Sequence, residues 1–295
     1  MKIGFVGLGN MGGPMCRNLI KGVNHEVILH DLDATAVAAC TAAGGTAAAS
    51  LTALAADCDV IFTSLPTPRH VEAVILGSGG VAEHARPGTV VLDLSTNAPA
   101  VVKHLHENLA ARGISFLDAP VTGGVARATE GTIVVMVGGD EAVFETQRGL
   151  LAAFSTTQVH VGPVGAASVA KLVNNMLALC NMAVAAEGMM IGAMAGIDLG
   201  KLADIIRNGS GDSMVFRSMA TRGLKGEFRA NFALDLAYKD LGLAVDLAAE
   251  HGVPGLVAPQ VLNLMRIARG MGFGAQDSTA MLRVYETLLG REVRL

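Results

Sequence analysis

Short apolar runs alternate with helical stretches along the first half of the chain. Most runs are nearly continuous in hydrophobic residues and end at glycine, proline or small polar residues, which is typical of strands buried on both faces. Seven such runs are present, at 2–7, 26–31, 59–65, 89–95, 114–120, 132–139 and 157–162. Strand and helix in this rhythm predict a mostly parallel, doubly wound α/β sheet with helices on both sides.

A long, almost uncharged stretch follows the last of these runs. From 165 to about 195 the sequence has no proline, and its only charged residues are Lys171 and Glu187. A helix of roughly 30 residues would be about 45 Å long. Eighteen or more apolar residues also fit a transmembrane span, but three asparagines interrupt the stretch and no basic cluster flanks it. We therefore interpret it as a helix that links two domains.

The remainder of the chain is predicted to be helical. Further helices are expected over 232–251, 259–271 and 278–289. We therefore expect an N-terminal Rossmann-type, doubly wound domain over 1–162 and an all-α C-terminal domain over 163–295, joined by the long helix. Apolar helix faces such as 176–195 need a cover, so a homodimer or homotetramer is expected.

Composition narrows the classes of function. The net charge of the 295 residues is −4 and no basic cluster occurs, so binding to nucleic acid or an anionic membrane has no electrostatic support. The four cysteines form no CxxC pair, which favours a reducing compartment over a disulfide framework or a zinc site. His104 and His106 are two residues apart on a predicted helix and cannot share a ligand, so we expect no metal. A strand begins directly after Met1, and we expect a cytoplasmic protein without a cleaved leader.

A glycine-rich segment follows the first predicted strand and precedes a helix. It consists of Gly7, Leu8, Gly9, Asn10, Met11 and Gly12. In the GxGxxG pattern the first glycine permits a tight turn, the second lets the backbone approach a pyrophosphate, and the third allows close packing of helix on strand. A glycine-rich turn without a ligand is the alternative. We interpret the segment as a dinucleotide-binding loop, because its strand and helix context fits.

The end of the second predicted strand bears on the choice of cofactor. Asp31 stands about 20 residues after the glycine segment, where a carboxylate accepts hydrogen bonds from ribose hydroxyls and repels the 2′-phosphate of NADP. No Lys or Arg occurs between Gly22 and Pro68 to balance that phosphate. We therefore expect NAD, with NADP less favoured unless a distant arginine reaches the site.

Candidate substrate groups follow two later strands. The segments 93–99 and 118–124 come at the carboxyl edge of the predicted sheet, where ligands of doubly wound folds bind. Thr122 offers a hydroxyl, and Gly123 and Gly124 offer unhindered backbone N–H groups, which suit a small carboxylate. A turn that merely requires glycine explains the same residues.

Lys171 is the only lysine or arginine between Arg148 and Lys201. Its neighbours are apolar, and loss of hydration favours the neutral amine, which can accept a proton. Asn175 lies four residues later, on the same face of the predicted helix. A surface lysine whose stem covers apolar area is the alternative.

Taken together, these segments resemble the β-hydroxyacid dehydrogenase family over most of the chain. The matching segments are GLGNMG at 7–12, DLSTNAP at 93–99, DAPVTGG at 118–124, GPVGAASVAKLVNN at 162–175 and KDL at 239–241. The resemblance implies that Lys171 is catalytic. It implies substrate contacts for Ser95, Thr122, Gly123, Gly124 and Asn175, and cofactor contacts for Leu65, Pro66, Thr96 and Lys239. For Lys239 an ordinary helix ion pair with Asp235, four residues earlier, is the alternative.

The sequence therefore predicts an NAD-dependent 3-hydroxyacid dehydrogenase. Lys171 would exchange the hydroxyl proton while hydride passes between the substrate carbon and the nicotinamide. The favoured reaction interconverts 3-hydroxyisobutyrate and its semialdehyde, and reduction of tartronate semialdehyde (2-hydroxy-3-oxopropionate) is the alternative. Related imine reductases lack this lysine, which argues against that class. A non-catalytic dinucleotide-binding module would leave Lys171 and Asn175 unexplained.

Overall fold

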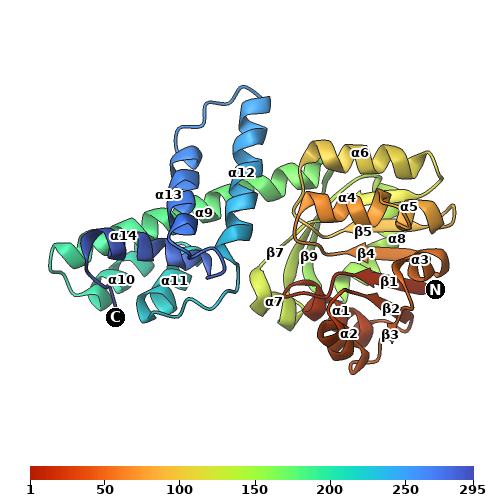
Figure 1. The fold of residues 1–295 in the computed structure, drawn as a ribbon, viewed down its shortest axis with the longest axis horizontal. Coiled ribbons are helices and arrows are strands. Elements are labelled where there is room, and N and C mark those ends of the chain that lie inside the picture. Colours follow the sequence, from red (N-terminus) through yellow and green to blue (C-terminus); the bar gives the residue numbers. More distant parts are fainter. The chain divides into compact units, whose positions relative to one another are not determined.

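The computed structural model describes all 295 residues, which form two compact units, Met1–Lys171 and Leu172–Leu295. The first unit contains a nine-stranded sheet (Figure 1). Its strands are β1 (Lys2–Val6), β2 (Glu26–His30), β3 (Thr46–Ala47), β4 (Val60–Thr63), β5 (Val90–Asp93), β6 (Ser115–Asp118), β7 (Val121–Thr122), β8 (Ile133–Gly138) and β9 (Ser155–Gly162). All seven predicted strands are confirmed. The two-residue strands β3 and β7 are too short to produce a hydrophobic pattern of their own.

The sheet is parallel over most of its width. Its order is β3-β2-β1-β4-β5-β6-β8-β7, with β9 paired to β8. The exceptions are β8 and β9: β8 runs antiparallel to β6 and β7, and β9 pairs in parallel with β8 and so shares its direction. The parallel strands β2, β1, β4, β5 and β6 therefore end at one edge, and the predicted cofactor and substrate segments follow them there.

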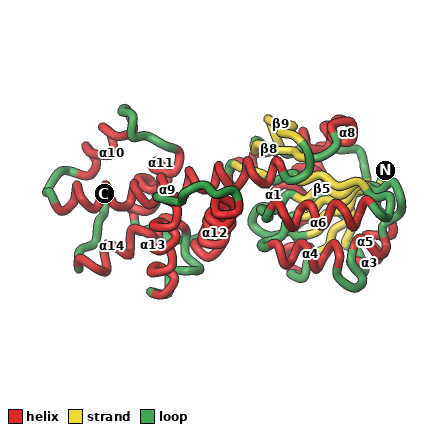
Figure 2. The backbone as a smooth tube through the Cα atoms, turned by 90° about the horizontal axis from the view of Figure 1, so that it is seen from above, coloured by secondary structure: helices red, strands yellow, loops and turns green.

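Helices cover both faces of this sheet, as predicted. They are α1 (Gly12–Gly22), α2 (Ala34–Thr41), α3 (Leu51–Asp57), α4 (Pro68–Leu76), α5 (Val81–His84), α6 (Pro99–Ala110), α7 (Gly124–Glu130) and α8 (Glu141–Ala152). Figure 2 shows the strands between α8 on one side and α4 and α6 on the other. Side chains alternate along each strand, so Phe5 and Phe62 enter one core cluster whereas Val6 and Ile61 enter the other. Continuous apolar runs follow from this double burial.

The second unit is helical. The long helix α9 (Ala166–Met194) begins in the first unit and continues into the second, followed by α10 (Leu199–Arg207), α11 (Met214–Thr221), α12 (Leu234–Glu250), α13 (Ala258–Gly270) and α14 (Met281–Leu289). Short 3₁₀ turns occupy Gly223–Lys225 and Ser278–Ala280. The predicted long helix and the three later helices are confirmed, whereas α10 and α11 were not predicted. The core of this unit combines alanine with flexible methionine side chains, which fill irregular gaps between helices.

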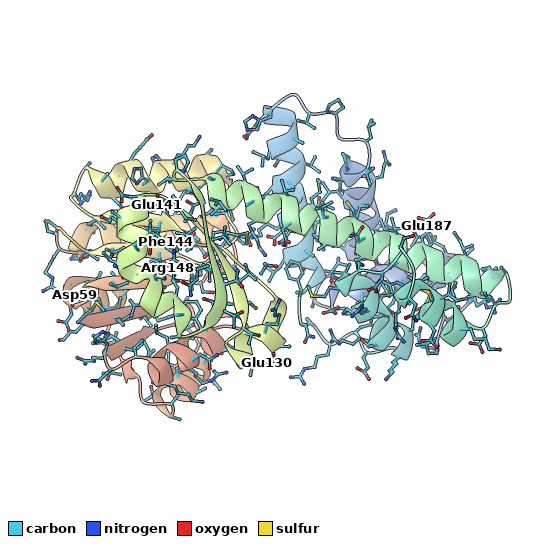
Figure 3. All side chains as sticks on the ribbon, turned by 180° about the vertical axis from the view of Figure 1, so that it is seen from behind. Asp59, Glu130, Glu141, Phe144, Arg148 and Glu187 are labelled. Atoms are coloured by element: carbon cyan, nitrogen blue, oxygen red, sulfur yellow. The ribbon has the colours of Figure 1, made fainter.

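Helix α9 is long and apolar enough to cross a membrane by length and composition alone, although one such helix is a weak signal. Half of its most apolar window is buried inside the protein. The buried residues Met182, Ala186, Met189 and Ala193 recur at helical spacing and belong to the core cluster of the second unit. Glu187, labelled in Figure 3, accepts a hydrogen bond from Tyr285 at 3.2 Å. These contacts favour the interpretation of α9 as a core helix over that of a membrane span.

Candidate active site

The glycine-rich loop after β1 has the geometry of a dinucleotide cradle. Gly7 has a φ of +92°, and a Cβ there would lie 2.3 Å from the Ser64 carbonyl oxygen. A Cβ on Gly12 would lie 1.9 Å from the Gly7 carbonyl oxygen, so only glycine permits the close start of α1. At Gly9, by contrast, no atom lies within 4 Å of an added Cβ. The exposed Gly9 backbone thus leaves room for a pyrophosphate near the start of α1.

Asp31 lies at the end of β2, where a ribose-binding carboxylate was predicted. Its Oδ2 accepts the Leu8 backbone N–H at 2.5 Å, and its Oδ1 accepts the Asp33 N–H at 2.8 Å. A carboxylate has about four lone-pair sites, so these bonds fix its orientation and leave capacity for ribose hydroxyls. The residues of this loop therefore fit a bound dinucleotide.

Arg17 is a cation near this loop that lies outside the range 22–68. A hydrogen bond from the Cys16 thiol and the guanidinium of Arg17 lower the pKa of Cys40, whereas burial and, to a smaller extent, the Asp31 carboxylate act in the opposite direction. Arg17 and Asp31 thus lie close to the same buried thiol. The sequence shows only that Arg17 lies in the first turns of α1. Its proximity to Cys40 could not be predicted, because it arises from the packing of α1 on α2.

The loops after β4 and β5 are held together by a buried carboxylate. Asp93 is 1% exposed, and its Oδ1 accepts the Thr63 hydroxyl at 2.8 Å and the Ser95 N–H at 3.1 Å. Ser95 in turn accepts the Leu65 N–H at 2.9 Å. The structure therefore brings Ser95 together with Leu65, and Pro66 and Thr96 are their chain neighbours. Burial raises the pKa of Asp93 and the surrounding donors oppose that shift.

Thr122, Gly123 and Gly124 follow β6 on the short strand β7 and the start of α7. The φ angles of Gly123 and Gly124 are +134° and +75°, in the region that favours glycine. The turn therefore requires glycine at both positions, as the structural alternative supposed. This requirement is compatible with carboxylate binding, which would use the backbone N–H groups and not a side chain.

Helix α9 carries Lys171 and Asn175, as predicted, and both are buried. Lys171 is 9% exposed, which is inconsistent with an ordinary surface lysine. Asn175 donates from Nδ2 to Asp240 Oδ2 at 2.6 Å, and Lys239 Nζ lies 2.8 Å from Asp240 Oδ1. A single carboxylate, itself 3% exposed, therefore joins a predicted substrate residue to a predicted cofactor residue. Asp240 was not predicted, although it stands in the KDL segment.

Three further features bear on the candidate site: Asp235, possible metal ligands and the cavities of the first unit. Asp235, the alternative partner of Lys239, lies 2.5 Å from Arg269. No group of three or more His, Cys, Asp or Glu side chains has an arrangement that could hold a metal ion. Two cavities of the first unit, lined by residues of α6, by 113–116 and by the segments around Asp140 and Pro163, contain none of the predicted site residues.

Known proteins match the chain over almost its whole length. A family model for the NAD binding domain of 6-phosphogluconate dehydrogenase matches residues 2–162. A second model, for the NAD-binding region of NADP-dependent 3-hydroxyisobutyrate dehydrogenase, matches residues 165–285. The 2-(hydroxymethyl)glutarate dehydrogenase of Eubacterium barkeri is 39% identical, over 99% of this chain and 97% of that protein. The NAD-dependent L-serine dehydrogenase of Pseudomonas aeruginosa is 35% identical, over 98% and 99%.

A solved structure has the same architecture. The crystal structure of 3-hydroxyisobutyrate dehydrogenase from Salmonella typhimurium has a TM-score of 0.89 and 31% identity, covering 96% of this chain and 99% of that one. Fold, glycine cradle and relatives together define an NAD(P)-dependent oxidoreductase that acts on the CH–OH group of a hydroxy acid. The chain belongs to the β-hydroxyacid dehydrogenase family. The resemblance noted in its sequence motifs is thus confirmed.

Proposed function

We propose that this protein interconverts a small 3-hydroxy carboxylate and its semialdehyde, with NAD as the preferred cofactor. The named substrates of the relatives support this class: 2-(hydroxymethyl)glutarate, L-serine and 3-hydroxyisobutyrate all contain a CH₂OH group next to the carbon that bears a carboxylate. They differ in the substituent on that central carbon. We favour 3-hydroxyisobutyrate, with reduction of tartronate semialdehyde as the alternative.

The buried position of Lys171 is the observation that carries the mechanism. Bound NAD supplies the hydride acceptor. In oxidation the neutral amine of Lys171 accepts the hydroxyl proton, and in reduction the ammonium donates it. The Asn175 amide orients the substrate and is itself held by Asp240 at 2.6 Å. Thr122 and the N–H groups of Gly123 and Gly124 receive the carboxylate.

The test is NADH formation, followed by absorbance, with a panel of 3-hydroxyisobutyrate, L-serine, 3-hydroxypropionate and 2-(hydroxymethyl)glutarate, and NADH consumption with tartronate semialdehyde. Lys171→Ala should lower kcat about 10²- to 10⁴-fold while the Kd for NAD stays nearly unchanged. Lys201→Ala, at an exposed position of α10, is the matched control. Near-normal turnover of Lys171→Ala would remove the lysine from the mechanism. No turnover with any substrate would favour a non-catalytic dinucleotide-binding module.

Assembly and location form a second part of the proposal. Leu177, Val184 and Ile191 are spaced seven residues apart on α9 and are 56%, 62% and 62% exposed. Such a stripe supports a homodimer or homotetramer, and a monomer in light scattering would contradict it. The free cysteines support a cytoplasmic protein. We place the domain limits at 1–162 and 163–295, because β9 ends at Gly162.

A further inference from the structure

Asp118 is a buried carboxylate outside the predicted set of site residues. It ends β6 and is 1% exposed. Its Oδ1 accepts the Gly165 N–H at 2.9 Å, and its Oδ2 accepts the Ser168 N–H at 2.9 Å and the Ser168 hydroxyl at 3.1 Å. Burial raises the pKa of this carboxyl, whereas the three donors favour its charged form. The hydrogen bonds offset the cost of burying the charge.

These donors belong to the beginning of α9. Gly165 precedes the helix, and Ser168 lies in its first turn, where backbone N–H groups have no partner within the helix. Asp118 therefore caps α9 from a strand of the sheet. A negative charge at this end also interacts favourably with the helix dipole. The result is that the start of α9 is fastened to the carboxyl edge of the sheet, the edge that carries the dinucleotide cradle.

Lys171 follows the fastened turn directly. It lies three residues after Ser168, which corresponds to about 4.5 Å along the helix axis. Long side chains in a helix leave the backbone directed toward its N-terminus, so the Lys171 side chain starts out toward the turn that Asp118 holds. Helix α9 is continuous through both residues. A shift of its first turn relative to the sheet would therefore shift the lysine by a similar amount.

Gly138 keeps the necessary space open. It pairs with Asp118 between β8 and β6. A Cβ at Gly138 would lie 2.4 Å from Asp118 Oδ1 and 2.9 Å from the Pro163 carbonyl oxygen. The φ of Gly138 is not positive, so glycine is needed there for room and not for a turn. Strand β8 thus contributes to the same arrangement.

We infer that Asp118 is a positioning residue for the dehydrogenase reaction, which sets the place of the Lys171 amine relative to the reacting groups. The inference rests on the proposed function, in which Lys171 exchanges the substrate proton. A displacement of about 1 Å in a reacting group can cost roughly 100-fold in rate. Loss of Asp118 should therefore lower kcat and leave NAD binding nearly unchanged, because a different segment, residues 7–12, forms the dinucleotide cradle.

The decisive variant is Asp118→Asn, which keeps the size of the side chain but turns one acceptor into an NH₂ group facing a donor. We expect kcat to fall about 10- to 100-fold and the Kd for NAD to stay within about twofold, while the melting temperature falls, because a buried donor loses its acceptor. The isotope effect on kcat with substrate deuterated at the reacting carbon should rise, because the chemical step becomes slower than product release. Gly138→Ala should give the same pattern, and the double variant should be no worse than the poorer single variant.

Asp140→Asn is the matched control, since it makes the same change at the residue that caps α8, and its kcat should be unchanged. Lys171→Ala separates the two levels of the argument. If the unchanged protein turns over no substrate of the panel, the proposed function fails. If Lys171→Ala is fully active, the role of the lysine in the mechanism fails and the inference fails with it. If Lys171→Ala is inactive but Asp118→Asn and Gly138→Ala have normal kcat, only the positioning role is wrong.

A second variant covers the case in which Asp118→Asn does not fold. Ser168→Ala removes only the hydroxyl bond of 3.1 Å and keeps the backbone bond of 2.9 Å. Because the backbone bond remains, we expect kcat to fall by less than in Asp118→Asn. An unchanged kcat and isotope effect in Ser168→Ala would overturn the inference.

Discussion

Three glycines of the first unit allow the dinucleotide cradle to be tested by the same change, glycine to alanine. At Gly12 the added Cβ would meet the Gly7 carbonyl oxygen at 1.9 Å, so the backbone must shift. Forcing an extra carbon into a packed site costs about 1–3 kcal/mol. At Gly9 nothing lies within 4 Å, so the free protein should tolerate the Cβ. The same holds for Gly149 in the exposed part of α8, where alanine should stabilise the helix by about 0.5–1 kcal/mol.

The affinity for NAD should follow a different order among the three variants than their stability does. The Cβ of Gly9→Ala would stand where the pyrophosphate approaches the backbone, and the loss of one hydrogen bond to a charged group is worth about 1.5–3 kcal/mol. This corresponds to a Kd for NAD raised roughly 10- to 150-fold. Gly12→Ala should lose both stability and NAD affinity, whereas Gly149→Ala should bind NAD normally.

The assay combines thermal unfolding of the free protein with calorimetric titration of NAD. The informative result is the contrast between Gly9→Ala and Gly12→Ala: intact stability with weak binding for the first, and loss of both for the second. If Gly9→Ala binds NAD as tightly as the unchanged protein, the dinucleotide does not approach the backbone at Gly9 and the assignment of this loop is wrong.

Other predictions concern single polar groups. Asp31→Asn should weaken the binding of NAD and strengthen that of NADP, because repulsion of the 2′-phosphate is lost while Arg17 supplies a nearby cation. The Michaelis constants for both cofactors test this prediction, and an unaltered ratio of the two would contradict it. Asp240→Asn removes the charge paired with Lys239 at 2.8 Å, so KM for cofactor or substrate should rise about 10-fold. Unchanged kinetics would show that Asp240 does not position Asn175 and Lys239 for binding. Burial and, after it, the Glu187 carboxylate raise the pKa of Tyr285 to about 12. The tyrosinate absorbance of Tyr285, identified by its loss in Tyr285→Phe, should therefore appear only near pH 12. Its appearance near pH 10 would refute the contact between Tyr285 and Glu187.

The sequence predicted the sheet well because its strands are buried on both faces. Each long strand then needs a continuous apolar run, which is visible without knowledge of its neighbours. The helices α10 and α11 were missed, since they are short and their apolar residues pack on a core whose other members lie far along the chain. The antiparallel direction of β8 was also not predicted. An apolar run has the same composition in either direction, and only pairing decides the direction.

The sequence by itself determined the local chemistry of the site: the glycine loop at 7–12, the carboxylate of Asp31, and the lone lysine on a long helix. Each depends on residues within a few turns of one another, whose spacing the chain fixes. Only the tertiary structure decided which groups hold that chemistry in place. Asp240 meets Asn175 across 65 residues of chain, and Asp118 meets Ser168 across 50. Buried carboxylates find their donors through the packing of strands and helices, so their partners cannot be read from spacing.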